Sequence, residues 1–351
     1  MMLRSVIKSA TAGAISWTRL DRLARVNIHR HVPFVLCYHR VVERLHTSNG
    51  FALPAMEITV AMLEHHLDWL GRHFRIVSLD DLGTKLRESA GSKPLAAITF
   101  DDGYSDIYHH AFPLLKRKGI PAGIFVVTDL IGSARLPIHD ELHGVLAGAA
   151  EQWPSMRDRL TELLQRTAVL SSQDLTDPFS ATRCLLQRLP QSDVLRIIDR
   201  LQTSTATDEN WRRALQPLNW EMLAEMRKAG MTIGSHSMTH AFLTNESRDR
   251  VREEAECSRR ELERKLGVQA EWFAYPGGNF NPSVVRAVAR AGYRYAFTDC
   301  RHRDPQHPLL TIPRKSLWER SCLDPFGRFS PAIMSCHAAA MFDRFSDCAD
   351  H

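Results

Sequence analysis

Short apolar segments alternate with helical patterns along most of this chain, and this alternation limits the folds open to it. The segments share β-branched and aromatic residues and a length of four to six residues: 33–38, 74–77, 96–100, 122–127, 231–235, 272–275, 293–298 and 309–312. Stretches with apolar residues at helical spacing, such as 104–118 and 247–266, lie between most of them. Strands that are separated by helices form parallel sheets. We therefore expect an α/β fold whose parallel sheet is closed, or nearly closed, into a barrel.

The alternation stops at about residue 133. Residues 135–215 carry helical patterns separated by polar loops, with no convincing strand. We interpret them as a helical insertion that lies beside the strand ends, where barrels of this class carry their sites. The chain then divides into a helical lead-in (1–32), a main domain (33–320) and a C-terminal tail (321–351).

The composition is that of an ordinary globular protein, with 44% hydrophobic and 24% charged residues. The net charge of +5 is spread out without a basic, aromatic-rich stripe, which argues against nucleic-acid binding. Seven scattered cysteines without CxxC spacing argue against a disulfide framework or a structural zinc site. Neither a membrane span nor a signal-peptide apolar region is found. We expect a cytoplasmic protein, with peripheral association at the inner membrane face left open.

Two adjacent carboxylates, Asp101 and Asp102, follow the strand at 96–100 and precede Gly103. Functional groups gather at the carboxyl ends of strands in α/β folds. Neighbouring side chains of a strand point to opposite sides, so the two acids are expected to have different roles. One would bind a cation and the other would handle a proton. The simpler alternative is a strand-to-helix turn capped by Asp102 or Ser105.

Two histidines four residues apart, His236 and His240, begin where another strand ends. They can reach one cation from the same side if the segment turns into a helix. Histidines at this spacing also cap helices and fill half-buried positions. Together with Asp102 they would supply three ligands and leave positions for water and substrate, as in a catalytic metal site.

A tight turn, Tyr275-Pro276-Gly277-Gly278, ends a third strand. Glycines let backbone N–H groups approach a substrate closely. We therefore expect Tyr275, Pro276 and Gly277 to line an oxyanion or substrate contact, with a plain turn as the alternative.

The three segments resemble the signature motifs of the polysaccharide deacetylases (the NodB-homology proteins, carbohydrate esterase family four). They read T-F-D-D-G at 99–103, S-H-S-M-T-H at 235–240 and F-A-Y-P-G-G at 273–278. The resemblance covers about residues 33–315 and implies a distorted (β/α) barrel. It also implies that Asp101 is the general base, while Asp102, His236 and His240 bind a divalent metal, usually zinc.

Two departures from that family's pattern concern the base and the acid. Many members carry an arginine in the third motif that orients the base, where Trp272 and Phe273 stand here. Many also carry an acid histidine in a late Leu-x-His motif, near which residues 310–314 stand. The segment 37–41, C-Y-H-R-V, is similar to the start of the permuted branch that includes deacetylases of biofilm poly-N-acetylglucosamine. By that similarity His39 is the catalytic acid, and a backbone-bonded histidine at a strand end is the alternative.

The resemblance implies removal of N-acetyl groups from an N-acetylhexosamine, in an exopolysaccharide or in its lipid-linked precursor. Zinc would acidify a water, Asp101 would take its proton and His39 would protonate the departing amine. Three alternatives stay open. They are another amide hydrolase (deformylase or imidase-like), an Fe(II) site for oxygen chemistry, and a glycan-binding module that has lost catalysis.

Overall fold

The computed structural model describes residues 32–45, 55–87, 94–164, 175–202 and 209–342, together with residue 53 and isolated positions before residue 32. Within them one nine-stranded parallel sheet runs in the order β10-β9-β8-β7-β6-β5-β1-β11, with β4 beside β5. Its strands are β1 Phe34–Tyr38, β4 Arg75–Ile76, β5 Leu95–Phe100, β6 Gly123–Val126, β7 Thr232–Ser235, β8 Trp272–Ala274, β9 Tyr295–Thr298, β10 Ile312–Pro313 and β11 Lys315–Ser316. The parallel α/β architecture predicted from the alternation is confirmed.

One short stretch of chain closes the sheet. β10 pairs with β9, and β11, which follows after a single residue, pairs with β1. The two ends of the strand order are therefore consecutive in the chain, with only Arg314 between them. A sheet whose ends are joined in this way is a barrel. It is a distorted one, because each half of the closing stretch pairs over two residues only.

The interior of the barrel changes from apolar to polar along the strands. Val35 of β1 and Ala97 of β5 belong to a buried cluster with apolar side chains of β6, β8, β9 and β10. Because alternate residues of a strand face the same side, Thr99 and then Asp101 continue the inward face of β5. The polar groups therefore collect at the carboxyl ends of the strands.

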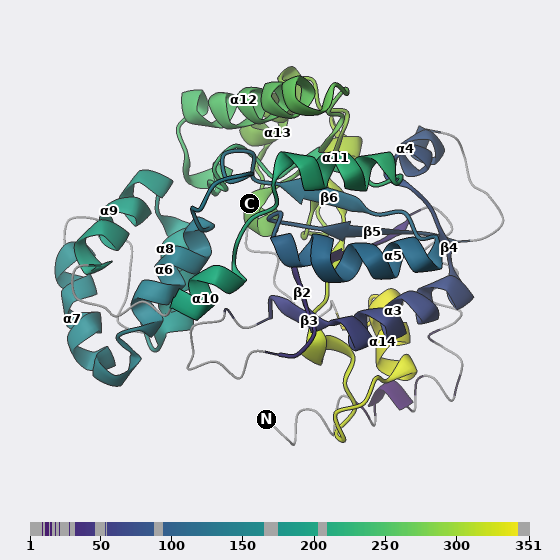
Figure 1. Ribbon diagram of the computed structural model, residues 1–351, viewed down its shortest axis with the longest axis horizontal. Coiled ribbons are helices and arrows are strands. Elements are labelled where there is room, and N and C mark those ends of the chain that lie inside the picture. The colour runs from purple at the N-terminus through teal and green to yellow at the C-terminus, as the bar shows by residue number, and fades with distance from the viewer. Residues whose placement is uncertain are drawn as a thin grey trace.

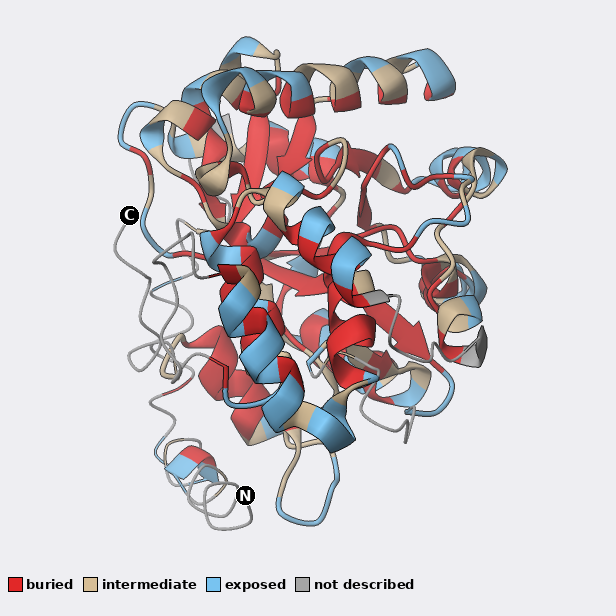
Figure 2. Cartoon of the chain, turned by 90° about the vertical axis from the view of Figure 1, so that its left-hand side faces the viewer, coloured by how far each residue is buried: buried red, intermediate tan, exposed pale blue. Residues whose placement is uncertain are grey.

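Helices cover the outside of the barrel, with their buried faces turned toward the strands and exposed faces turned outward (Figure 2). They are α3 Val60–His73, α4 Leu79–Arg87, α5 Phe112–Lys118, α11 Trp220–Lys228, α12 Arg248–Leu266, α13 Pro282–Arg290 and α14 Pro331–Ala338. A small parallel pair, β2 Arg40–Val42 and β3 Glu57–Thr59, lies beside them.

Helix ends follow the local sequence signals. The side chains of Asn219 and Ser247 cap α11 and α12 by accepting from backbone N–H groups. Gly119 ends α5 in the left-handed conformation, with φ of 64°. The helix expected at 104–118 is present from residue 105 to residue 118, with a wide π turn at Ile107–Ala111. One predicted boundary is wrong: residues 308–310 form a 3-10 turn, so that β10 starts only at Ile312.

Residues 135–215 form the predicted helical insertion, which stands to the left of the barrel in Figure 1. Its helices are α6 Ile138–Ala147, α7 Trp153–Leu164, α8 Pro178–Arg188, α9 Gln191–Gln202 and α10 Glu209–Ala214. It has a hydrophobic core of its own, in which Leu142, Leu160 and Leu185 are fully buried. Its described residues contain no strand.

Of the two terminal segments in the predicted domain division, the structure describes most of the C-terminal one but only scattered positions of the N-terminal one. Only scattered positions of the lead-in 1–32 are described, so that prediction lies outside the described residues. The segment after residue 320 contributes α14, whose Ile333, Met334 and Cys336 are fully buried in the main core. The domain boundaries themselves stay a prediction. Among the described helices, none combines the length and the apolar character needed to cross a membrane.

Two glycine substitutions test the packing of the barrel. A Cβ atom at Gly234 in β7 would lie 2.5 Å from the Phe125 ring, inside the barrel. We expect Gly234→Ala to lower the free energy of unfolding by about 1–3 kcal/mol through overpacking. Gly71 is exposed in α3 with no atom near its Cβ position, so Gly71→Ala should raise the free energy of unfolding by about 0.5–1 kcal/mol. Urea unfolding measures both, and a neutral Gly234→Ala would contradict the packing described here.

Candidate active site

Polar side chains from three strand ends meet at the mouth of the barrel. Asp101 and Asp102 follow β5, His236 follows β7, and His39 follows β1. His236 Nε2 lies 3.7 Å from Asp101 Oδ2 and 3.5 Å from Asp102 Oδ1. His240 Nε2 lies 3.2 Å from the same Asp102 oxygen. The structure thus brings together the three residues that the sequence predicted as metal ligands.

The surroundings of Asp102 fit a divalent metal ion. Both of its carboxylate oxygens are buried and have no hydrogen-bond partner. Such an unpaired buried charge is unfavourable unless a cation satisfies it. His236 places its Nδ1 2.8 Å from the Ala274 carbonyl, to which it donates, so Nε2 is left as a lone pair facing Asp102. Burial lowers the pKa of His236 to about 4, which keeps the ring neutral and able to bind a metal.

The backbone at these ligands is held in a conformation that side chains rarely adopt. Asp102, Ser237 and His240 have φ values of 66°, 68° and 65°. Positions of this kind persist only when their surroundings hold them, and they cluster at functional sites. Ser237 Oγ accepts from the His240 N–H at 3.0 Å, and the buried Glu254 of α12 accepts from the Thr239 N–H at 2.9 Å. The candidate metal-binding segment, residues 236–240, is therefore fixed from two sides.

Asp101 is held by an arginine that the sequence analysis missed. Arg314 Nη1 donates to Asp101 Oδ1 at 2.8 Å, and Nη2 donates to Oδ2, while Nε donates to Asp299 at 3.1 Å. Burial by itself would raise the pKa of Asp101, but the Arg314 charge lowers it below its ordinary value. Asp101 is therefore ionised at neutral pH. The signal that could have identified Arg314 is its position two residues after Ile312, which puts it on the inward face of the closing strand.

His139, on the first turn of α6 in the insertion, is the second residue that the sequence analysis missed. Its Nε2 lies 3.7 Å from Asp102 Oδ2 and 2.8 Å from the Tyr104 hydroxyl. The ligand atoms of Asp102, His139 and His240 lie within 4.8 Å of one another, so this group could hold a metal ion. The sequence signal that could have identified His139 is the pair of His139 and Asp140 at the start of an otherwise largely apolar helix.

His39 is half-buried and lies next to the base. The ligand atoms of Cys37, His39 and Asp101 are within 4.8 Å of one another. The predicted acid and the predicted base therefore share one end of the barrel, which a proton donor to the same reacting bond requires.

The turn at 275–278 only partly matches its predicted role. The ring of Tyr275 is fully buried and its hydroxyl donates to the Leu310 carbonyl at 3.0 Å, so its side chain supports the barrel, and its role in a substrate contact stays a prediction. Pro276 has no N–H group to offer. Gly277 has a φ of 64°, and a Cβ atom there would meet the Phe242 ring at 2.4 Å. The backbone of Gly277 thus remains the predicted donor.

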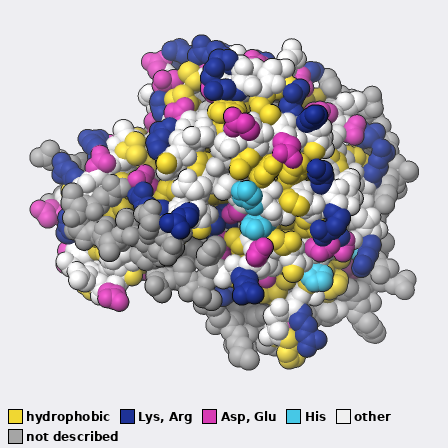
Figure 3. Space-filling view, in the orientation of Figure 1, with side chains coloured by type: hydrophobic (Ala, Val, Ile, Leu, Met, Phe, Trp, Pro, Cys, Tyr) yellow, Lys and Arg dark blue, Asp and Glu magenta, His cyan; other side chains and the backbone are white. Residues whose placement is uncertain are grey.

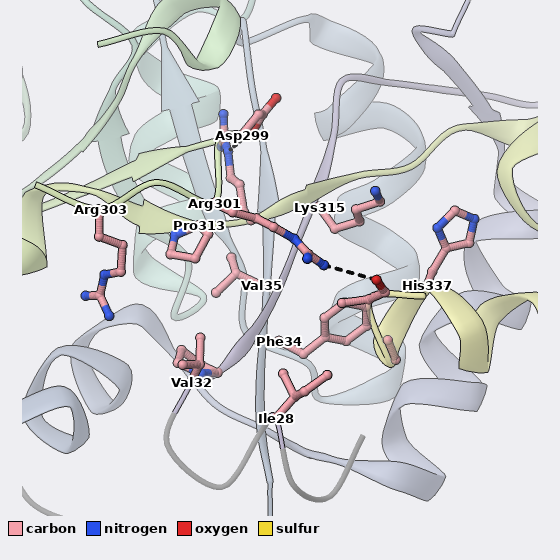
Figure 4. A pocket seen from close by; sticks show the side chains of 14 residues that line it. Ile28, Val32, Phe34, Val35, Asp299, Arg301, Arg303, Pro313, Lys315 and His337 are labelled. Carbon is pink, nitrogen blue, oxygen red and sulfur yellow. Dashed lines mark hydrogen bonds and ion pairs between the residues drawn. The ribbon is translucent and has the colours of Figure 1, made fainter. Parts of the chain in front are cut away.

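The protein also has a cavity of about 330 Å³, which Arg314 helps to line. Figure 4 shows it from close by. The start of β1, the Pro313–Lys315 stretch, the Asp299–Arg303 segment and the end of α14 line it, and it contains none of the motif residues. On the face shown in Figure 3, acidic and basic side chains are intermixed with hydrophobic ones, without a patch of one sign.

Comparison with known proteins agrees with this geometry. The sequence profile of the family "Polysaccharide deacetylase" matches residues 88–171 and 180–296, more than half of the chain. The chain belongs to the polysaccharide deacetylase family. YxkH of Bacillus subtilis (strain 168), whose name places it among the polysaccharide deacetylases, is 20% identical over 285 residues, covering 81% of this chain and 67% of YxkH.

Two solved structures share the fold. IcaB from Ammonifex degensii superposes with a TM-score of 0.54 at 18% identity, over 88% of this chain and 98% of that chain. The Streptococcus pyogenes deacetylase PplD, in complex with acetate, gives a TM-score of 0.52 at 17% identity, over 84% of this chain and 95% of that chain. At this level of identity, these two structures establish the shared barrel.

The metal site can be tested by replacing its residues one at a time. We expect Asp102→Ala, His236→Ala or His240→Ala to lower the bound metal sharply, because each removes one of a small number of ligands. Elemental analysis of the purified variants measures this, with Gly71→Ala as the matched control. Unchanged metal content in all three variants would show that the cluster is not the metal site.

The buried pair of Asp101 and Arg314 predicts a non-additive effect on stability. Arg314→Met leaves the Asp101 charge unpaired and should lower the free energy of unfolding by about 3–5 kcal/mol. Adding Asp101→Asn should recover part of this loss, because it removes the unpaired charge. Arg294→Met, which breaks the exposed pair with Glu271, should change the free energy of unfolding far less, because solvent screens an exposed ion pair. Equal losses for Arg314→Met and Arg294→Met in urea unfolding would refute the interpretation.

Proposed function

We propose that this protein is a metal-dependent deacetylase that removes N-acetyl groups from an N-acetylhexosamine in a glycan. The observation that carries the proposal is the division of labour between two neighbouring buried carboxylates. Asp101 has both oxygens occupied by Arg314, whereas Asp102 has both oxygens unpaired among imidazoles. This arrangement fits a base beside a metal site, and the family membership supplies the reaction class.

The donor set favours zinc as the metal, because neutral imidazoles and a carboxylate are typical zinc ligands. When bound, the ion supplies Lewis acidity, which lowers the pKa of water at the site toward about 7 and polarises the amide carbonyl. Asp102, His236 and His240 would hold it.

The remaining steps belong to side chains of the chain itself. Asp101, oriented by Arg314, accepts a proton from the attacking water. The backbone N–H of Gly277 stabilises the negative charge that develops on the carbonyl oxygen. His39 donates a proton to the departing nitrogen, since an amine anion is a poor leaving group. The products are acetate and a free amino sugar.

The substrate proposed here is an acetylated polysaccharide or its lipid-linked precursor. The first is what the family name describes, and the segment 37–41 resembles the start of the branch that includes deacetylases of poly-N-acetylglucosamine. The insertion lies beside the site and carries His139 into it, which supports a role in shaping the substrate cleft. A cytoplasmic location and peripheral membrane association stay predictions.

The direct test is acetate release by metal-loaded protein from a panel of N-acetylated glycans and lipid-linked amino sugars. N-formylated sugars and cyclic imides in the same panel test the other amide hydrolases. Binding of glycans without release of acetate, by protein that contains its metal, would leave a binding module as the better description.

Two variants separate the proton-transfer roles. Asp101→Asn should retain metal and substrate affinity but lower kcat by about 10²–10⁴-fold, on amides and on activated aryl acetate esters alike. His39→Ala should also retain metal, but its defect should shrink on the ester, whose leaving group needs no proton. Steady-state kinetics on both substrates measure this. A His39→Ala protein with unchanged amide hydrolysis would transfer the acid role to another group, with His307 as the next candidate.

A further inference from the structure

The first turn of α6 brings a third imidazole to the predicted metal site. His139 is buried, its Nε2 lies 3.7 Å from Asp102 Oδ2, and its ring centre lies 4.7 Å from that of His240. His236 approaches Asp102 through the other carboxylate oxygen, Oδ1. The two oxygens of Asp102 therefore face different imidazoles, and the His139 side of the group lies on the insertion.

Unpaired polar atoms are concentrated in this group. Within the described residues, both oxygens of Asp102, Nδ1 of His139 and Nδ1 of His240 are buried without a hydrogen-bond partner. Leaving buried polar atoms unpaired is unfavourable, so their concentration in one group indicates a partner that the protein itself does not supply. Neutral nitrogens and a carboxylate together are the donor set of a divalent metal.

The neighbours of His139 hold the ring as metal-binding histidines are held. The Tyr104 hydroxyl donates to Asp140 at 2.6 Å, so its oxygen is left to accept from His139 Nε2 at 2.8 Å. A ring that donates through one nitrogen keeps the other unprotonated, the form in which imidazole binds metals. In His236 the donating nitrogen is Nδ1, bonded to the Ala274 carbonyl, whereas in His139 it is Nε2, so that the buried Nδ1 of His139, which has no hydrogen-bond partner, is the nitrogen left to bind a metal.

The insertion is also fixed to the metal-binding segment at a second point. Gln191, on α9, donates to the Thr239 carbonyl at 2.8 Å and accepts from the Thr239 hydroxyl at 2.7 Å. Thr239 lies directly before His240. The position of His139 is therefore set by contacts that do not involve the metal, and such preorganisation is what a metal site needs.

We propose that His139 is an additional ligand of the metal, so that the helical insertion completes the metal centre as well as lying beside it. Three imidazoles and one carboxylate, all typical zinc ligands, would then hold the ion. The metal then links the insertion to the barrel. This inference rests on the proposed metal site but not on the identity of the acetylated substrate.

X-ray absorption at the zinc edge tests the proposal, because it counts the imidazoles bound to the ion without any measurement of activity. We expect three imidazoles in the wild-type protein and two in His139→Gln, which keeps a polar group beside Tyr104. The matched control is His143→Ala, one turn later on α6, where Nδ1 lies 3.2 Å from Thr182 Oγ1. It should keep three. Zinc affinity measured against a chelator should fall by at least about 10–100-fold in His139→Gln, since even residues that merely orient ligands reach this range.

Each outcome bears on one of two proposals. Two imidazoles in the wild-type protein, or the same count in wild type and His139→Gln, overturn the assignment of His139 and leave the site of Asp102, His236 and His240 intact. Zinc retained at full affinity by Asp102→Ala overturns the whole metal site and the assignment of His139 with it. A folded His139→Gln protein with one imidazole fewer and weaker zinc binding supports the proposal, and urea unfolding verifies that it is folded.

Discussion

The ion pair between Asp101 and Arg314 connects the closure of the barrel to its chemistry. Arg314 is the single residue between β10 and β11, so its position depends on pairing with β9 on one side and β1 on the other. Its side chain crosses the interior to a carboxylate that follows β5. Removing one partner of such a buried pair costs about 3–5 kcal/mol, since the other charge stays buried. The same contact thus favours the closed barrel and keeps Asp101 ionised and oriented.

The carboxylate of Asp102 has a different environment from that of Asp101, because the backbone turns between these two residues. Strand alternation alone predicted that the acids point to opposite sides, but β5 ends at Phe100, before either of them. Asp102 instead has a left-handed backbone, with φ of 66°, which directs its side chain toward the histidines. Of the two acids, Asp101 is satisfied by Arg314, whereas both oxygens of Asp102 are buried without a hydrogen-bond partner. The different environments of the two acids follow from the local backbone conformation at Asp102 and from Arg314, which lies 213 residues from Asp101 along the chain.

The parts of the fold that the sequence predicted are those governed by local patterns. Strand and helix alternation, capping by Asn219 and Ser247, and the motif residues at three strand ends all depend on nearby residues. Arg314 was missed because a two-residue strand carries too little pattern to be recognised and its partner is distant. His139 was missed because the apolar periodicity of α6 indicates a core face, and only tertiary packing shows which part of that face meets the barrel. The helix α14 was missed for a similar reason, since its apolar residues have no clear helical stripe.

The contacts of the candidate metal-binding segment, residues 236–240, show why the insertion at 135–215 matters for the site. Ser237 and His240 both adopt a backbone conformation that costs of order 1 kcal/mol or more for a residue other than glycine. Favourable contacts must offset that cost, and they come from two structural units: Glu254 of the barrel helix α12 and Gln191 of the insertion helix α9, which bond to adjacent groups of Thr239. Because Gln191 and His139 lie on different helices of one hydrophobic core, a shift of the insertion would move a support of the segment and an imidazole of the site together. The insertion is therefore better described as part of the framework that positions the ligands than as a loop added at the rim.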